Sequence, residues 1–429
     1  MKLEFQHKIS SPAFPFDIIS LIIDVVGENE DIDLLKELAL VSHSFLQLST
    51  KHIFANIDLR KSQKPCSKRG FIELVNNRPD VVRYIRKLDY EIDKDDLSES
   101  PQSSPTNSSL DDDDDQLFPI LSNLLATIPS LSSLIIDGSN KNWGSVDSSL
   151  TSTFLHLMHL PTIKFIGLES IKNFPGYGLF GSENLHRLEI RQMVLDSHLS
   201  DDEDGTLGLV LLSEVMPKIR ELIISEAYEL TAKLLLAKME NGLPAFKFVD
   251  LRLLSFALTQ SEDIRVFQHF IHNARFLEKL LLSTTHNYSL VGLHAVLAPR
   301  ARTLKSIELS VSLETVIGTV RLPLGGFCRE LEAMAGRNRL EELIFEIYLE
   351  SKDKEDFIGS IVQNVERVLV RPGFPALRRV IFSFHCLEPR SRRDAEELNE
   401  ILESSLPEKY LSNLLNHPSI VFDCISDIW

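Results

Sequence analysis

Apolar residues recur in one short pattern along most of the chain. Ten six-residue segments carry apolar residues at their first, fourth and sixth positions. They are IRKLDY at 85, LSSLII at 131, IKFIGL at 163, LHRLEI at 185, IRELII at 219, FKFVDL at 246, LEKLLL at 277, LKSIEL at 304, LEELIF at 340 and LRRVIF at 377. Because the fourth and sixth residues of a strand point to the same side, the pattern predicts ten short strands with one buried face.

Between these segments, apolar residues recur at the spacing of a helix. Leu150, Phe154 and Leu157 would share one side of a helix, and the apolar residues within 264–271 would do the same. A strand and a helix that alternate about ten times give parallel strands on one face and helices on the other. Each such unit buries its apolar residues only against its neighbours.

We therefore predict an α/β fold for residues 70–429, in the form of a degenerate leucine-rich-repeat solenoid with parallel strands on one face and helices on the other. The segments begin 22 to 46 residues apart, so the repeat is irregular. The same pattern also allows an ordinary α/β domain with one parallel sheet.

Residues 12–59 are organised differently, as three short predicted helices. The apolar residues of the first helix recur at a spacing that places them on one face: Phe14, Ile18, Ile19, Ile22, Ile23 and Val26. The second helix is predicted to begin near Asp33, and the third carries Phe45 and Leu48. Three short helices bury little surface alone, so this helical module needs a partner.

Two polar segments, at 93–116 and at 196–206, interrupt the repeat region. Both are poor in large apolar side chains, which predicts disordered loops. The acidic runs Asp111–Asp115 and Asp201–Asp204 supply nine acidic residues, about half of the net charge of −17. That net charge argues against nucleic acid as a partner, because binding requires cations that replace phosphate counterions. The densest basic run, from Arg60 to Arg69, contains no aromatic residue.

None of the candidate chemical motifs has the sequence context that its chemistry requires. GYGLFG at 176–181 matches G-x-G-x-x-G, but a predicted strand and not a helix follows it, so it predicts a loop rather than a dinucleotide site. The pairs His156/His159 and His269/His272 lie in apolar predicted helices without a third ligand. We therefore predict no catalytic, cofactor-binding or metal-binding residue.

The cysteines and the hydropathy bear on location. The four cysteines are far apart in the sequence, which is typical of reduced thiols in an intracellular protein. No run of 18 apolar residues predicts a membrane span. We expect a cytoplasmic or nuclear location and no membrane partner.

The predicted helical module resembles an F-box. The resemblance rests on FPFDIISLIIDVV and on LLKELALVSHSFLQLSTKHIF. F-boxes typically open with Leu-Pro, an acidic residue and paired aliphatics, and later carry Val-Cys/Ser-x-x-Trp/Phe and a closing aromatic. Phe14 and Pro15 fit the opening here, and Val41, Phe45 and Phe54 fit the later positions.

An F-box followed by leucine-rich repeats is similar to the substrate receptors of SCF ubiquitin ligases. The resemblance implies that the module binds a Skp-type adaptor, which links it to a cullin scaffold, while the repeats bind a protein substrate. The implied adaptor-binding residues are Phe14, Pro15, Ile18, Ile19, Ile22, Val41, Phe45 and Phe54.

Two other functions stay open on the sequence. In one, the chain is a repeat scaffold whose N-terminal helices only cap the first repeat, with no role in a ligase. In the other it is an enzyme, which would require a deep polar pocket that the sequence does not predict.

Overall fold

The chain forms two compact units. The computed structural model describes residues 15–29, 31–60, 68–94, 96–97, 117–195, 217–227, 230–232, 244, 246–259, 263–284, 290–313, 323–349, 355–386 and 392–428. The first unit comprises Met1–Ser139 and Ser145–Ile163, and the second comprises Asn140–Gly144 and Lys164–Trp429.

Parallel strands are the framework of both units. The sheet has twelve strands, and their order in the sheet is their order in the chain. They are β1 (Asn56–Leu59), β2 (Lys87–Glu91), β3 (Ser133–Asn142), β4 (Phe165–Lys172), β5 (Arg187–Arg191), β6 (Glu221–Ser225), β7 (Leu253–Leu258), β8 (Lys279–Thr284), β9 (Ser306–Leu313), β10 (Glu342–Leu349), β11 (Arg379–Cys386) and β12 (Val421–Ile428). The predicted α/β class with parallel strands is therefore confirmed.

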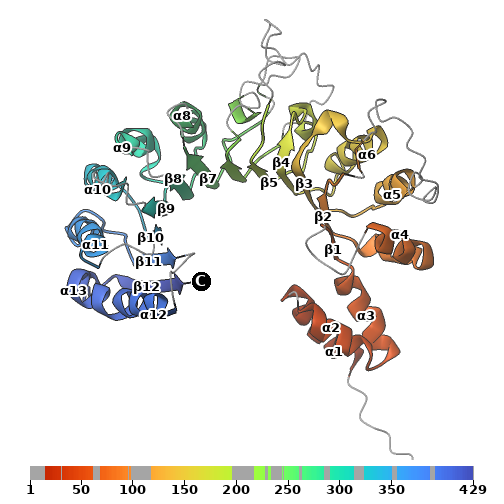
Figure 1. Ribbon diagram of the computed structural model, residues 1–429, viewed down its shortest axis with the longest axis horizontal. Helices are drawn as coiled ribbons and strands as arrows, with labels where there is room; N and C mark the ends of the chain where they lie inside the picture. The colour runs from red at the N-terminus through yellow and green to blue at the C-terminus, as the bar shows by residue number, and fades with distance from the viewer. Residues whose placement is uncertain are drawn as a thin grey trace, which may run out of the picture. The chain divides into compact units, whose positions relative to one another are not determined.

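Helices precede the sheet and connect its strands. The α-helices are α1 (Phe16–Glu28), α2 (Ile32–Ala39), α3 (His43–Ile53), α4 (Lys68–Asn77), α5 (Leu117–Ala126), α6 (Ser148–Met158), α8 (Asp263–Asn273), α9 (Leu293–Leu297), α10 (Pro323–Met334), α11 (Glu355–Leu369), α12 (Arg392–Glu400), α13 (Leu406–Tyr410) and α14 (Ser412–Leu415). Short 3₁₀ or π turns are η1 (Pro79–Tyr84), η2 (Trp143–Ser145), η3 (Gly176–Leu179), η5 (Ala298–Arg300) and η6 (Ile401–Ser405). In the second unit, helices α8 to α11 lie on the same face of strands β7 to β11 (Figure 1).

Nine of the ten predicted segments contain a strand, which begins in each case at the third residue of the segment. The fourth residues pair across the sheet, as Leu280 does with Ile307 and Ile307 with Leu343. These three side chains are buried. The first residues, such as Leu277 and Leu304, are buried as well. The apolar pattern therefore sets both the register of the sheet and its core.

A shared carbonyl lies just before nine of the twelve strands, β1, β2 and β4 to β10. The carbonyl of Arg252 accepts the N–H groups of Glu278 and Lys279, both at 2.9 Å. In the next repeat, the carbonyl of Glu278 accepts those of Lys305 and Ser306, at 2.8 and 3.0 Å. The same double bond forms on the carbonyls of Ala55, Arg86, Lys164, His186, Arg220, Lys305 and Glu341. These bonds align the start of each strand with that of its neighbour.

The segment FKFVDL at 246 is the one wrong strand prediction. Strand β7 follows it, and Leu251, Leu254 and Phe256 occupy the buried pattern positions. Phe248 instead packs edge-to-face on Phe270 of α8, with ring centroids 5.0 Å apart. Both segments satisfy the same spacing, and only packing distinguishes them.

Two boundaries also differ from the sequence-based expectation. Strand β1 lies within the predicted helical module 12–59, so the last four residues of that range belong to the sheet. Residues 93, 94, 96 and 97 belong to the segment predicted to be disordered, 93–116, but Asp93 and Asp96 are held in the fold. The part from 98 to 116 and the predicted loop at 196–206 lie outside the described residues.

A buried ion-pair cluster holds the chain after β2. The side chain of Asp96 is fully buried and accepts hydrogen bonds from Lys68 Nζ at 2.5 Å and from the Tyr90 hydroxyl at 2.9 Å. Lys68 Nζ also lies 3.1 Å from Asp93 Oδ2. Burial raises the pKa of Asp96, and the Lys68 charge opposes that shift. A buried charge is retained only where it is paired. Composition does not show which charged residues will be paired, and so it does not predict this cluster.

We expect Lys68→Met to lower the free energy of unfolding of the first unit by about 3 kcal/mol, because it leaves the buried Asp96 carboxylate without its cation. Urea unfolding of the full chain measures this loss. Lys36→Met is the matched control: the pair of Lys36 with Asp33 is exposed, and its removal should cost under about 0.5 kcal/mol. Equal losses for the two variants would contradict the assignment.

Candidate protein-docking surface

Side-chain caps begin two of the three N-terminal helices, and a proline precedes the other. Pro15 precedes α1, and its carbonyl accepts the N–H groups of Ile18 at 3.0 Å and Ile19 at 3.2 Å. The Asp31 side chain caps α2 by accepting the Leu34 N–H at 3.0 Å. The Ser42 hydroxyl caps α3 in the same way. Caps of this type terminate short helices within tight turns.

A polar contact joins α1 to α3. Asp24 Oδ1 lies 2.6 Å from Lys51 Nζ and 2.9 Å from His52 Nε2. Hydrogen bonds from Lys51 and then from His52 lower the pKa of Asp24. The His52 ring lies against Gly27, where an added Cβ would be 2.2 Å from His52 Nδ1. Glycine at this position of α1 therefore leaves room for the His52 ring.

The outer side of α1 is apolar. Ile18, Leu21, Ile22 and Val25 are 42%, 60%, 43% and 49% exposed. Their spacing of three and four residues places them on one face of the helix. Ile23, on another side of α1, is fully buried. The helix therefore presents apolar side chains both to its own module and to the outside.

A second exposed apolar group lies at the α2–α3 turn. Leu40 is 87% and Val41 65% exposed, and Leu34 and Leu46 are also exposed. The three helices and the α2–α3 turn contain nine of the seventeen exposed large apolar side chains found among the described residues, in about a tenth of the chain. We call these nine the docking surface: Phe16, Ile18, Leu21, Ile22, Val25, Leu34, Leu40, Val41 and Leu46. An apolar concentration of this kind is typical of interaction sites.

The predicted adaptor-binding residues fall into three groups. Pro15, Ile18, Ile22 and Val41 are exposed; Ile19, Phe45 and Phe54 are half-buried; and Phe14 lies outside the described residues. The sequence prediction did not include Leu21, Val25 or Leu40. The sequence contained a signal for Leu21 and Val25, because these two residues continue the three- and four-residue spacing of Ile18 and Ile22.

The prediction of a single apolar face on α1 is wrong. At about 100° per residue, the apolar residues from Ile18 to Val26 span about half of the helix circumference. Half a circumference is too wide for one contact, and so Ile23 packs inward while Ile18 and Ile22 face outward.

The other sequence motifs are surface or loop features. Gly176–Leu179 is the 3₁₀ turn η3, and the next regular element is strand β5, as expected for a loop. His156 and His159 are exposed, as are His269 and His272. Among the described residues, no group of three or more His, Cys, Asp or Glu side chains is arranged to hold a metal ion.

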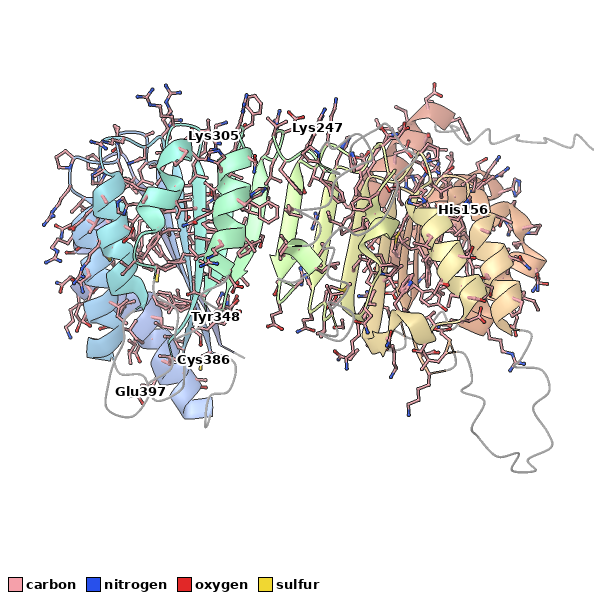
Figure 2. The ribbon with its side chains drawn as sticks, turned by 90° about the horizontal axis from the view of Figure 1, so that it is seen from above. His156, Lys247, Lys305, Tyr348, Cys386 and Glu397 are labelled. Carbon is pink, nitrogen blue, oxygen red and sulfur yellow. The ribbon has the colours of Figure 1, made fainter. Side chains whose placement is uncertain are left out.

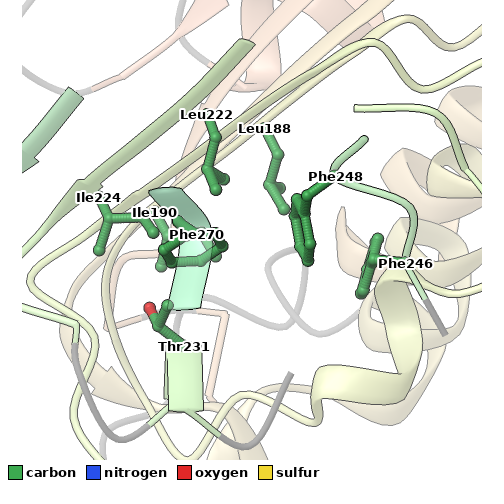
Figure 3. A pocket seen from close by; sticks show the side chains of 8 residues that line it. All are labelled: Leu188, Ile190, Leu222, Ile224, Thr231, Phe246, Phe248 and Phe270. Carbon is green, nitrogen blue, oxygen red and sulfur yellow. The ribbon is translucent and has the colours of Figure 1, made fainter. Parts of the chain in front are cut away.

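An apolar gap lies between strands β5–β6 and helix α8 (Figure 3). Its lining is Leu188, Ile190, Leu222, Ile224, Thr231, Phe246, Phe248 and Phe270. The one polar group among these side chains, the Thr231 hydroxyl, donates to the Ala227 carbonyl at 2.6 Å. These eight side chains offer no group for acid–base or metal chemistry.

No protein-family model matches this sequence, and no curated protein matches it. In the part of the chain that the structure describes, none of the helices combines the length and the apolar character needed to cross a bilayer.

We expect Gly27→Ala to destabilise the three-helix module, because the new methyl group displaces the His52 ring and breaks its hydrogen bond to Asp24. A double-mutant cycle with His52→Ala isolates the cost of the clash between the new methyl group and the His52 ring. Once the ring is removed, Gly27→Ala should be neutral or stabilising by up to about 1 kcal/mol, as helix propensity predicts. Thermal unfolding measures both steps, and equal effects in the two backgrounds would contradict the proposed contact.

Proposed function

We propose that the protein is a non-catalytic substrate-recognition subunit of an SCF-type ubiquitin ligase. In this proposal α1–α3 act as an F-box that docks to a Skp-type adaptor and through it to a cullin scaffold. Strands β1–β12 and their helices act as a leucine-rich-repeat solenoid that binds a protein substrate. The observation that carries the proposal is the docking surface, with its nine exposed apolar side chains on three short helices and the α2–α3 turn.

The energetics of burial support a protein partner for this surface. Transfer of apolar area out of water contributes about 25 cal/mol per Å². Leu21, Leu40 and Val41 are each more than half exposed and would gain most of that free energy on docking. Large anchors near the centre of an interface usually supply most of its affinity.

The sheet supports the second half of the proposal. In the second unit, no described helix lies over the strand face opposite α8 to α11 (Figure 1). Strand alternation places Glu308, Glu346 and Tyr348 on that face, because their neighbours Ile307, Phe345 and Ile347 are buried. Such a face offers charged and aromatic side chains at a regular strand spacing. It suits a protein ligand better than a small molecule.

A capping role for the helices is the second candidate, and one observation favours it. Helix α3 packs against η1 and leads directly into β1, whose preceding residue Ala55 supplies the first shared carbonyl of the sheet. Capping accounts for the inner side of α3. It does not account for the outward-facing Ile18, Leu21 and Leu40, and so the docking function is preferred.

We expect the wild-type chain to bind a purified Skp-type adaptor with a dissociation constant at or below about 1 μM, measured by isothermal titration calorimetry. The double variant Ile18→Asp/Ile22→Asp should weaken binding at least about a hundredfold, because it places two carboxylates in the apolar contact. The double variant Leu40→Asp/Val41→Asp tests the other part of the docking surface in the same way.

The matched control is Val291→Asp/Leu415→Asp. These side chains are 72% and 51% exposed in the second unit, so the control makes the same chemical change away from α1–α3. It should retain wild-type affinity. A wild-type chain that binds no Skp-type adaptor at micromolar concentration would refute the ligase role and leave the capping role.

A further inference from the structure

The second unit has a strongly basic sheet edge. Its loops lead into strands β4 to β11 at one edge of the sheet, which we call the N-terminal edge. Figure 2 shows Lys247 and Lys305 at this edge, and Tyr348 and Cys386 toward the opposite one. The charge of these loops is opposite in sign to the net charge of the whole chain, which is −17.

The described loop residues at the N-terminal edge are 164, 180–186, 217–220, 246–252, 274–278, 298–305, 335–341 and 370–378. Their acidic members are Glu183, Asp250, Glu278 and Glu341. Their basic members are Lys164, Lys218, Arg220, Lys247, Arg252, Arg275, Arg300, Arg302, Lys305, Arg337, Arg339, Arg371 and Arg378. Cations therefore outnumber anions about threefold at this edge.

Most of these cations have no partner among the residues that the structure describes. Lys305 pairs with Glu278 at 3.1 Å, Arg371 pairs with Glu332 at 3.1 Å, and Arg300 donates to carbonyl groups at the end of α8. The other ten form no side-chain hydrogen bond or ion pair with any described residue, and all ten are exposed. They are Lys164, Lys218, Arg220, Lys247, Arg252, Arg275, Arg302, Arg337, Arg339 and Arg378.

The repeat geometry brings these cations to the same end of neighbouring strands. The position one residue before the strand holds Arg220, Arg252, Lys305 and Arg378 at β6, β7, β9 and β11, and Glu278 and Glu341 at β8 and β10. The remaining cations lie elsewhere in the same loops. Neighbouring strands lie about 4.8 Å apart, so the basic loops from β6 to β11 extend over about 24 Å. An extended polypeptide rises about 3.4 Å per residue and covers this length with about seven residues. Most of the free cations are arginines, whose planar guanidinium groups bind carboxylates in a bidentate manner.

We propose that the N-terminal edge of the second unit is a binding site for an acidic, extended segment of another protein. Charge complementarity supports this class of partner. Nucleic acid is disfavoured, since single strands are bound by successive stacked aromatics. Of the aromatic side chains in these loops, Phe276 is the exposed one. The surface lies outside α1–α3, and so the inference does not depend on the proposed adaptor contact.

The test uses the full chain and a fluorescein-labelled peptide of ten glutamates, followed by fluorescence anisotropy. We expect saturable binding that weakens at least about fivefold between 0.01 M and 0.1 M salt, as the screening length falls from about 30 Å to about 10 Å. The variant Arg252→Glu/Arg302→Glu/Arg339→Glu should lose at least about tenfold in affinity. The milder Arg→Gln triple should lose less, and it guards against misfolding, which circular dichroism checks.

Arg265→Glu/Arg329→Glu/Arg367→Glu is the matched control. It changes the net charge by the same amount, but its three exposed arginines lie on helices α8, α10 and α11. The control should stay within about twofold of the wild type. No binding by the wild type, or equal losses in the two triples, overturns the proposal. Tighter binding of an oligouridine with ten phosphates than of the peptide overturns the choice of partner in favour of nucleic acid.

Discussion

The register of the parallel strands is the constraint on which the structure depends. Before nine of the twelve strands, one carbonyl accepts two N–H groups from the next repeat, as the carbonyl of Arg252 does from Glu278 and Lys279. This contact fixes where each strand begins, whatever the length of the connection before it. Connections of very different length can therefore coexist with an unbroken row of buried residues such as Leu254, Leu280 and Ile307.

The N-terminal helices have a much smaller buried core than the sheet. Among the described residues of α1–α3, the large apolar side chains that are fully buried are Ile23 and Leu35, and nine others in these helices and the α2–α3 turn are exposed. The hydrogen bond between Asp24 and His52, whose ring lies against Gly27, adds to this small core. The module therefore has a small core and a large exposed apolar surface. That distribution is the physical basis for proposing a protein partner here.

Charge is distributed as unevenly as apolar surface. Much of the acidic excess lies in Asp111–Asp115 and Asp201–Asp204, whereas the loops before β4 to β11 are basic. The repeat gathers single cations at one sheet edge, because each loop enters its strand at that edge. The net charge of −17 conceals this basic edge.

The sequence determined what local periodicity can encode. It predicted the α/β class, nine of the ten proposed strands, and three N-terminal helices, because burial on one side of a strand or helix imposes a spacing on the apolar residues. Packing between distant segments decided the rest. FKFVDL and the segment at Leu251 carry the same spacing, and contact with α8 left only the second as a strand. The division of α1 into inner and outer faces, and the burial of Asp96 against Lys68, likewise depend on neighbours far away in sequence.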